Sequence, residues 1–361
     1  MTQERRRDQG MKRIRYFDLL RIISFIMVIF YHMMIQLQLD GICPEGRLRP
    51  FYQNGNIHMA TLAVALFFML SGAGLTVSAE RGFSLKKYYK GRFERLLIPF
   101  YLAVLALYLL ALVFHHRPPV VFSSGTPAWR YIFTVLGVDE WVSMHGYSTF
   151  STGIGEWFLG ALIILSVLFP VFYFCMKRRP VIFLAACFGV YLFAALSDRF
   201  SVPVHMNLLL KGFEFVLGMY FGRYMARIPK AVRAAAAVPA VIICAGFPVL
   251  NISTAFIIPL AASAVFVSVS LAEPLLQKGR TAFLAKAALY SYPVFLVHHQ
   301  VIFRMTPLFA PYYSGAFSVA LFFLAEAAVM VLAGILLKLL ADCTVRLING
   351  QKIRRVKAGD Q

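Results

Sequence analysis

Three ionisable side chains stand inside one apolar stretch, RYFDLLRIISFIMVIFYHMM, which covers residues 15–34. They are Asp18, Arg21 and His32. On an α-helix the residues from Arg21 to His32 turn through about 1100°, about 20° more than three full turns, and rise about 16 Å. Both side chains therefore share one helix face, and Asp18 lies within about 40° of it. This spacing predicts an anion-binding cation at one end of a helix and an imidazole base near the other.

The same three residues have a simpler interpretation. Arg21 would snorkel to lipid headgroups, Asp18 would pair with Arg21, and His32 would be a buried imidazole hydrogen-bonded to a neighbouring helix. Ionisable groups inside hydrocarbon are costly, so three on one stripe favour a functional role.

A second cationic group lies in GRFERLLIPF, which begins at residue 91. Arg92 and Arg95 are three residues apart, so they share one helix face, and Pro99 is expected to open the helix just beyond them. If their helix packs against the first, Arg21 would join them in a phosphate-binding cluster. The alternative is ordinary anchoring of basic residues at the cytoplasmic surface.

Small residues interrupt the apolar sequence FFMLSGAGL, residues 67–75. Ser71, Gly72 and Gly74 predict close packing between helices. Ser71 is also a conceivable nucleophile, although no base adjoins it in the sequence.

Three further residues are candidates for a supporting role: Glu156, Glu214 and His298. Glu156 begins an apolar segment at the outer surface, and Glu214 lies well inside another. His298 and His299 are adjacent in SYPVFLVHHQVIF. Adjacent helical residues point about 100° apart, which predicts that at most one of these histidines faces a given cavity.

Apolar segments of membrane length must position these residues. The 361 residues are 60% hydrophobic and 14% charged, which is typical of a bilayer protein. The sequence predicts an all-α polytopic membrane protein with about ten transmembrane helices. They cover about residues 17–38, 57–79, 95–114, 154–175, 180–197, 204–225, 233–250, 252–272, 284–303 and 314–340.

Basic residues indicate the orientation. Lys and Arg outnumber Asp and Glu by 36 to 16. They cluster in alternate connections, which the positive-inside rule assigns to the cytoplasm together with both termini. The predicted organisation is a basic segment at 1–16, a transmembrane domain at 17–342 and a basic tail at 343–361. A nucleic-acid-binding domain would not be this apolar, so membrane lipid is the expected partner and nucleic acid is not.

The remaining features constrain the chemistry less. The five cysteines are scattered without metal-like pair spacing, so neither a metal site nor a disulfide framework is expected. A long external connection, about 115–153, is rich in aromatic residues and is expected to cover an external cleft.

In order along the chain, these motifs resemble those of the acyltransferase-3 family, membrane-bound O-acyltransferases of bacterial surface polysaccharides. The similar features are Arg21 followed by ten residues and His32, then FFMLSG, RFERLLIP, EWFLGALIILSVLFP and SYPVFLVHH. By this resemblance Arg21 and His32 correspond to the family's essential pair, and Arg92 and Arg95 correspond to its paired arginines.

The resemblance implies a cytoplasmic acyl-CoA donor, usually acetyl-CoA, as a substrate, and no permanently bound cofactor is expected. The acceptor would be a glycan or glycolipid hydroxyl at the outer face of a bacterial inner membrane. Family members often carry an extracytoplasmic hydrolase-like domain. This chain has none, so the membrane domain or a separate protein is expected to complete the transfer.

The positions of these residues and the family resemblance predict the same mechanism. The CoA phosphates would bind the three arginines, and the pantetheine arm would reach His32. His32 would act as a general base or carry the acyl group. Ser71 would orient the thioester, while Glu156 or His298 would shape the acceptor side.

A transporter or flippase for a glycan or small metabolite is the main alternative, because polar groups on a helix face also line substrate paths. The absence of an internal repeat and the separation of cations from histidines favour the enzyme. A third alternative is a structural or sensing subunit. The acyl group, the acceptor and the oligomeric state are left open by the sequence.

Overall fold

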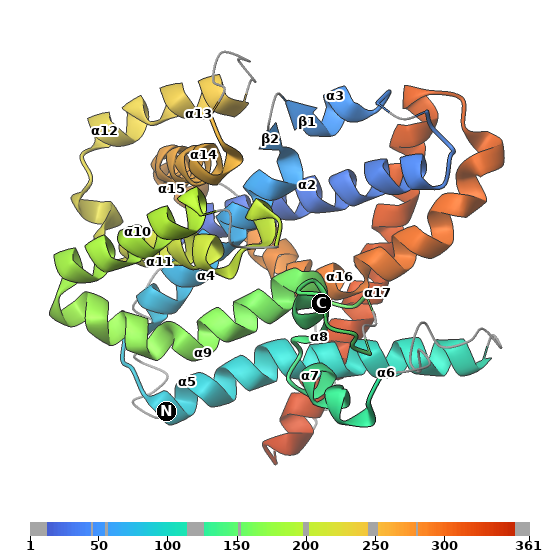
Figure 1. The fold of residues 1–361 in the computed structure, drawn as a ribbon, viewed down its shortest axis with the longest axis horizontal. Coiled ribbons are helices and arrows are strands. Elements are labelled where there is room, and N and C mark those ends of the chain that lie inside the picture. The colour runs from blue at the N-terminus through green and yellow to red at the C-terminus, as the bar shows by residue number, and fades with distance from the viewer. Residues whose placement is uncertain are drawn as a thin grey trace.

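The structure is a computed structural model that describes residues 13–44, 46–54, 57–113, 126–150, 153–197, 202–244, 252–278 and 281–350. Within these ranges the chain is helical apart from its connections and one antiparallel pair of two-residue strands, β1 (Gln53–Asn54) and β2 (Ile57–His58) (Figure 1). The all-α prediction is confirmed with that one exception, which lies between the first two long helices.

Long helices form most of the structure. They are α2 (Arg15–Leu39), α4 (Met59–Glu80), α6 (Ile98–Val113), α9 (Glu156–Arg178), α10 (Pro180–Leu196), α11 (Leu208–Tyr224), α14 (Thr254–Val269), α16 (Ala282–Met305) and α17 (Ala316–Ile348). The shorter α-helices are α3 (Arg49–Tyr52), α5 (Leu85–Arg92), α7 (Tyr131–Val135), α8 (Asp139–Ser143), α12 (Lys230–Ala235), α13 (Ala237–Cys244) and α15 (Glu273–Lys278). A π turn, η1 (Phe93–Leu97), and five 3₁₀ turns complete the set: η2 (Ala128–Arg130), η3 (Val204–Met206), η4 (Met225–Arg227), η5 (Ser270–Ala272) and η6 (Thr306–Tyr312).

Every predicted apolar segment contains a helix. The seventh, predicted for 233–250, is broken into α12 and α13, and its residues 245–250 lie outside the described residues. The last helix continues past the predicted 340 to Ile348, because no glycine or proline lies between residue 340 and Gly350. Residues 1–12 and 351–361, most of the two predicted terminal segments, lie outside the described residues.

Among the described residues, six helical stretches are long and apolar enough to cross a membrane. They are Arg15–Leu39, Met59–Glu80, Leu85–Leu110, Glu156–Arg178, Thr254–Lys278 and Ala316–Ile348. Pro180–Leu196 is a shorter apolar helix. Their number supports a polytopic chain, while ten transmembrane helices stays a prediction.

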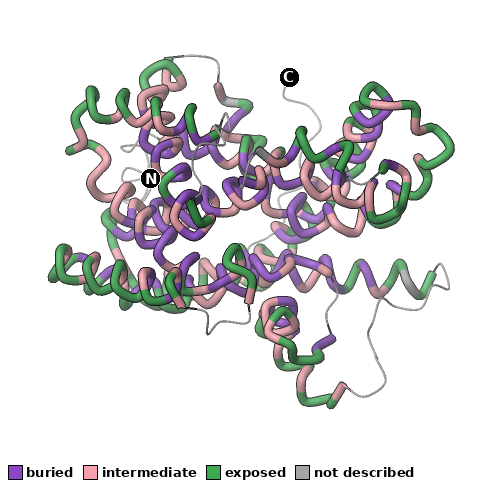
Figure 2. The backbone as a smooth tube through the Cα atoms, turned by 45° about the horizontal axis from the view of Figure 1, so that its top comes forward, coloured by how far each residue is buried: buried purple, intermediate pink, exposed green. Residues whose placement is uncertain are grey.

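The outward surfaces of these helices are apolar. Figure 2 shows buried residues where the helices meet and exposed residues along their outer faces. Val181 and Leu196 of α10 are 79% and 71% exposed, and Phe317 of α17 is 77% exposed. Soluble proteins rarely leave such large apolar patches uncovered. Multiple apolar helices with apolar outer faces indicate an integral membrane protein.

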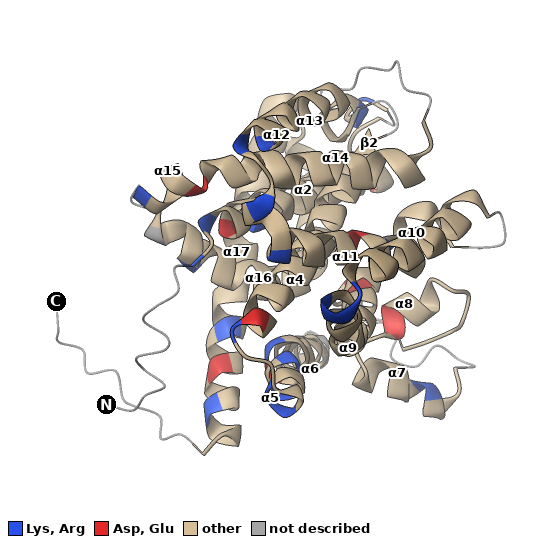
Figure 3. Ribbon diagram, turned by 90° about the vertical axis from the view of Figure 1, so that its left-hand side faces the viewer, with Lys and Arg blue, Asp and Glu red and all other residues tan. Residues whose placement is uncertain are grey.

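Charge is unevenly distributed over the molecule. Figure 3 looks onto the side where α5, α12 and α15 lie, and Lys and Arg are seen on these helices with few Asp or Glu between them. This agrees with the basic connections noted in the sequence. The cytoplasmic position of the two termini stays a prediction.

Close packing of α4 on α11 holds the centre of the fold. Gly72 faces α11, where an added Cβ would overlap the carbonyl oxygen of Phe215. Likewise, a Cβ added to Gly218 of α11 would overlap the backbone of Met69 in α4. The packing prediction for Gly72 is thereby confirmed. On its other side α4 packs against α2, which also contacts α16.

The start of α2 is held by ionic contacts. Glu273 accepts hydrogen bonds from the backbone N–H groups of Arg15 and Tyr16, at 3.1 and 2.8 Å. Asp18 is 2% exposed and accepts two hydrogen bonds from Arg13, at 2.6 and 2.7 Å. Its predicted partner Arg21 is 3.8 Å away. The pairing of Asp18 with Arg21 is thus present but secondary, because the nearer Arg13 holds both carboxylate oxygens.

The long connection before α9 is partly folded. Its described residues, 126–150, contain η2, α7 and α8. α8 packs against α9, where a Cβ on Gly160 would come within 2.6 Å of the Cβ of Trp141. Residues 114–125 lie outside the described residues, and the predicted external cleft stays a prediction.

Candidate active site

A cavity of about 440 Å³ is bounded by α2, α4, α5 and η1. Its lining includes the three arginines singled out in the sequence, Arg21, Arg92 and Arg95, and also Ser71. Lys87 adds a fourth cation, and none of the described lining residues is an Asp or Glu. The structure thus joins the two cationic groups of the sequence in one positively charged cavity.

The paired arginines lie where the helix changes geometry. α5 ends at Arg92, and the π turn η1 follows before α6 begins. Pro99 has no N–H to donate to the carbonyl of Arg95, which accounts for the local rearrangement. The opening therefore includes Arg95 and does not lie just beyond the arginine pair, where the sequence predicted it. Such π turns are frequent at functional sites.

Arg92 is held in place by α9. Its Nη2 donates a hydrogen bond to the Oγ of Ser166 at 2.7 Å, and its Nε is buried without a hydrogen-bond partner. Arg95 is exposed at the mouth of the same cavity. One arginine is thus positioned by the protein with capacity left for a ligand, whereas the side chain of the other is exposed.

The small residues of α4 lie on two faces of the helix, one packed against α11 and one lining the cavity. Gly72 packs on α11, while Ser71 and Gly74 line the cavity and Gly74 has open space around its Cα. No His, Asp or Glu is among the described lining residues, so a base for a nucleophilic Ser71 is not present there. The role of Ser71 in orienting the thioester stays a prediction.

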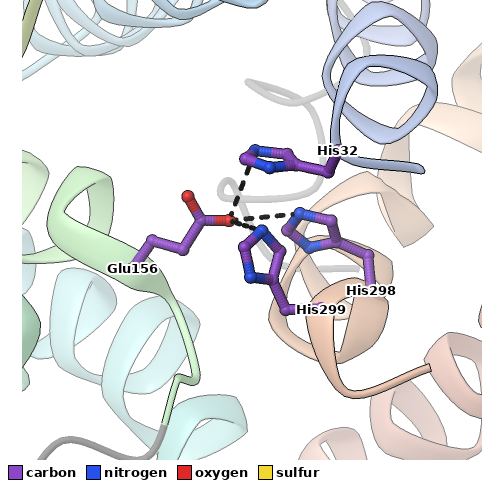
Figure 4. Close-up of side chains that lie close together, drawn as sticks. All are labelled: His32, Glu156, His298 and His299. Atoms are coloured by element: carbon purple, nitrogen blue, oxygen red, sulfur yellow. Dashed lines mark ion pairs between the residues drawn. The ribbon is translucent and has the colours of Figure 1, made fainter. Parts of the chain in front are cut away.

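His32 lies further along α2, in a cluster with Glu156, His298 and His299 (Figure 4). The Oε1 atom of Glu156 lies 2.7 Å from Nε2 of His299, 3.2 Å from Nε2 of His298 and 3.7 Å from Nε2 of His32. One ligand atom from each residue lies within 4.8 Å of all the others. Helices α2, α9 and α16 therefore bring three imidazoles and one carboxylate to a single point.

An unusual backbone turn aims Glu156 into this His–Glu cluster. Its φ angle is 47°, which makes it the one non-glycine residue with positive φ among the described residues. Gly155 before it has φ 81°, and Gly153 has φ 66°. Glu140 of α8 accepts a hydrogen bond from the N–H of Gly153 at 2.5 Å. Left-handed backbone at a non-glycine residue costs energy, and it persists here because the surrounding turn fixes it.

The imidazole of His298 is fixed by a backbone carbonyl. The side chain is 1% exposed, and its Nδ1 lies 2.5 Å from the carbonyl oxygen of Phe295. In a neutral ring that contact places the proton on Nδ1 and turns the Nε2 lone pair toward Glu156. Nε2 of His298, Nε2 of His299 and Oε1 of Glu156 are all buried without a partner in hydrogen-bond geometry. The His–Glu cluster therefore has polar capacity that its own contacts do not satisfy.

Sequence reasoning found three members of this cluster and missed one. His32, Glu156 and His298 were candidates, and the structure brings them together. The expectation that only one of the adjacent histidines faces a given site is wrong, because the two rings approach Glu156 from different directions on α16. The signal that could have revealed His299 was the His–His pair itself.

Glu214 belongs to neither group of residues. It pairs with Lys211 at 2.7 Å, and both side chains are almost fully buried. The two residues line a separate small cavity with His205. The i,i+3 spacing of Lys211 and Glu214 was visible in the sequence and accounts for this placement.

Comparison with known families settles the class of the protein. The profile of the acyltransferase domain that defines the acyltransferase-3 family matches residues 14–339. The chain belongs to the acyltransferase-3 family. The match includes every residue of the cationic cavity and of the His–Glu cluster, and membership implies O-acyltransferase activity. No curated protein and no solved structure matches this acyltransferase.

Proposed function

We propose that this acyltransferase moves an acetyl group from cytoplasmic acetyl-CoA to a sugar hydroxyl of an extracytoplasmic or lipid-linked glycan. The main observation behind the proposal is that α2 connects the cationic cavity with the His–Glu cluster. One helix contributes Arg21 to the cationic cavity and His32 to the His–Glu cluster. The rise between these two residues is about 16 Å.

The cavity suits the phosphates of CoA. Guanidinium groups match phosphate oxygens in pairs, and Arg92 is already oriented by Ser166. Four cations line the cavity without an Asp or Glu among the described lining residues, and Asp18, which lies 3.8 Å from Arg21, is held mainly by Arg13. The 3′-phosphate and pyrophosphate would bind Arg21, Arg92 and Arg95, and Ser71 would contact the pantetheine arm.

The His–Glu cluster suits the transfer step. His32 would accept the proton of the acceptor hydroxyl while the hydroxyl oxygen attacks the thioester carbonyl. The C–S bond would then break, and the CoA sulfur would leave with the proton returned by His32. Glu156, 3.7 Å from Nε2 of His32, would stabilise the positive charge that forms on the ring. A brief acyl-imidazole on His32 is the alternative form of the same step.

The location follows from the apolar helices and the basic connections. An integral membrane protein with its basic side inward would take the donor from the cytoplasm and present the acyl group on the outer side. The bacterial inner membrane, where glycan precursors are assembled, fits this arrangement.

Mass spectrometry of surface glycans from cells with and without the protein tests the proposal. Loss of about 42 Da per site, the chemical mass of an added acetyl group, is expected on deletion, and restoration is expected from the intact gene but not from its His32→Ala form. Unchanged glycan acylation in the deletion would contradict the proposed acceptor. Glycan or metabolite counterflow in proteoliposomes without acyl-CoA would support transport instead.

A further inference from the structure

We propose that Glu156, His298 and His299 form a binding site for a divalent transition-metal ion of the zinc type, with His32 beside its open position. Two histidines and one glutamate are a donor set that holds catalytic zinc and leaves a fourth position for substrate. The Nε2 atoms of His299 and His298 lie 2.7 and 3.2 Å from the carboxylate oxygen, and Nε2 of His32 lies further from it, at 3.7 Å.

The contacts within the His–Glu cluster leave space for a shared positive centre. With its proton held toward Phe295, neutral His298 turns a lone pair toward a carboxylate oxygen, which also carries lone pairs. Such a contact is repulsive unless a positive centre lies between the two atoms. The same carboxylate faces His299 at 2.7 Å without hydrogen-bond geometry. A metal ion shared by the three groups would satisfy all of these buried atoms together.

The outer contacts have the form expected of metal ligands. A metal-bound histidine usually donates its second ring N–H to a carbonyl or carboxylate, as the Nδ1 of His298 does to Phe295. The positive φ of Glu156 fixes the direction of its carboxylate independently of the histidines. Imidazole nitrogens with one carboxylate favour zinc and its first-row neighbours over calcium or magnesium, which prefer oxygen ligands. Ligands from two distant helices also account for the absence of a metal motif in the sequence.

The role of the ion rests on the proposed function, whereas its binding does not. At the open position the ion would coordinate the acceptor hydroxyl and ease transfer of its proton to His32. The bonds made and broken would remain those of the proposed transfer. Arg92 and the cationic cavity take no part in holding the ion.

Metal content of the purified full-length protein tests the site. The protein is prepared in detergent with a tag that lacks histidine, exposed to zinc, passed over a desalting column and analysed by inductively coupled plasma mass spectrometry. About one zinc ion per chain is expected for the wild type and for His145→Ala, a histidine outside the cluster that contacts Trp141. Glu156→Gln and the double variant His298→Ala/His299→Ala are expected to retain less than about a tenth of that amount.

Because a variant could lose zinc simply by failing to fold, a second test uses the thermal stability of the wild type alone. The thermal midpoint is expected to fall after treatment with a chelator and to return with added zinc, because a ligand bound only by the native state stabilises it. A wild-type protein that neither retains zinc nor responds to it would overturn the site, as would equal zinc content in wild type and Glu156→Gln.

Acyl-CoA binding, measured on the same samples, separates this proposal from the proposed function. If the protein retains zinc but does not bind acyl-CoA, the metal site is supported and the donor role of the cationic cavity is contradicted. If the protein binds acyl-CoA but does not retain zinc, the metal site is contradicted and the donor role of the cavity is supported.

Discussion

The two ends of the functional stretch of α2 are built differently. Around Arg21 the cavity is partly open, and its cations are long side chains on α2, α5 and η1. Around His32 the groups are packed closely, and their ligand atoms lie within 4.8 Å of one another. The first arrangement can accommodate a large polyanion, whereas the second holds a fixed geometry. Substitutions should therefore have graded effects in the cavity and near-complete effects in the cluster.

His32→Ala should produce the largest loss. Removal of a general base lowers a rate by about 10²- to 10⁴-fold, while the acyl-CoA dissociation constant should stay within about twofold of wild type. The measurement is single-turnover transfer from labelled acetyl-CoA, with His145→Ala as the control. A rate within about threefold of wild type would remove His32 from the chemistry.

Glu156→Gln should come next. The variant keeps the shape of the side chain and loses its charge beside three imidazoles, so transfer should fall by about 10²-fold. Glu94→Gln is the matched control, because Glu94 lies outside both the cavity and the cluster and accepts a hydrogen bond from Asn349. Equal rates for the two variants would show that the charge of Glu156 is not needed.

Arg92→Ala should affect the donor and not the transfer step. Loss of a hydrogen bond between charged groups costs about 1.5–3 kcal/mol, which raises the acyl-CoA dissociation constant by about 10- to 150-fold. Isothermal titration calorimetry measures it, and Arg178→Ala at the far end of α9 serves as the control. Arg95→Ala should have a smaller effect, because Arg95 is exposed. An unchanged constant for Arg92→Ala would rule out the proposed phosphate contact.

The two faces of α4 give a matched pair of glycine substitutions. Gly72→Ala would overlap the backbone of α11 and should destabilise the protein by about 1–3 kcal/mol. Gly74→Ala meets nothing within 4 Å and should be neutral or stabilising by up to about 1 kcal/mol. Thermal unfolding in detergent compares them, and similar midpoints would contradict the assignment of the two faces.

Stability should also depend on pH through a buried carboxyl group of α8. Burial raises the pKa of Asp139 in α8 to about 7, and the neighbouring Glu140 adds to the shift. A carboxyl group with a raised pKa in the folded state favours folding at low pH, and that contribution is lost as the pH rises from about 4 toward 7. The slope is at most about 1.4 kcal/mol per pH unit. In Asp139→Asn the thermal midpoint should vary less with pH over this range than in the wild type. An unchanged dependence of the midpoint on pH would show that Asp139 does not titrate there.

The same comparison shows what could be predicted from the sequence. Helical periodicity placed Arg21 and His32 on one face, and the i,i+3 spacing paired Arg92 with Arg95. These relations are local, so the sequence contains them. Arg21 and Arg92 line one cavity only because α2 packs near the segment around η1. The sequence does not contain that packing, so it predicted the shared site only on the assumption that the two helices are neighbours.

The His–Glu cluster was harder to predict because its members are distant in the chain. The sequence placed Glu156 only at the start of an apolar segment, because the turn that directs its carboxylate depends on Gly153, Gly155 and α8. His299 was set aside by a rule about helix directions that ignores side-chain length. Glu214 was favoured because it is buried in a helix, but its charge is taken up by Lys211. In each case the outcome depended on tertiary contacts that no local pattern encodes.

An experimental structure of the protein with acetyl-CoA, obtained by cryo-electron microscopy, would test the account most directly. The account predicts CoA phosphates within hydrogen-bond distance of Arg21 and Arg92 and the thioester directed along α2 toward His32. Phosphates bound outside the cationic cavity, or a thioester directed away from the His–Glu cluster, would contradict it.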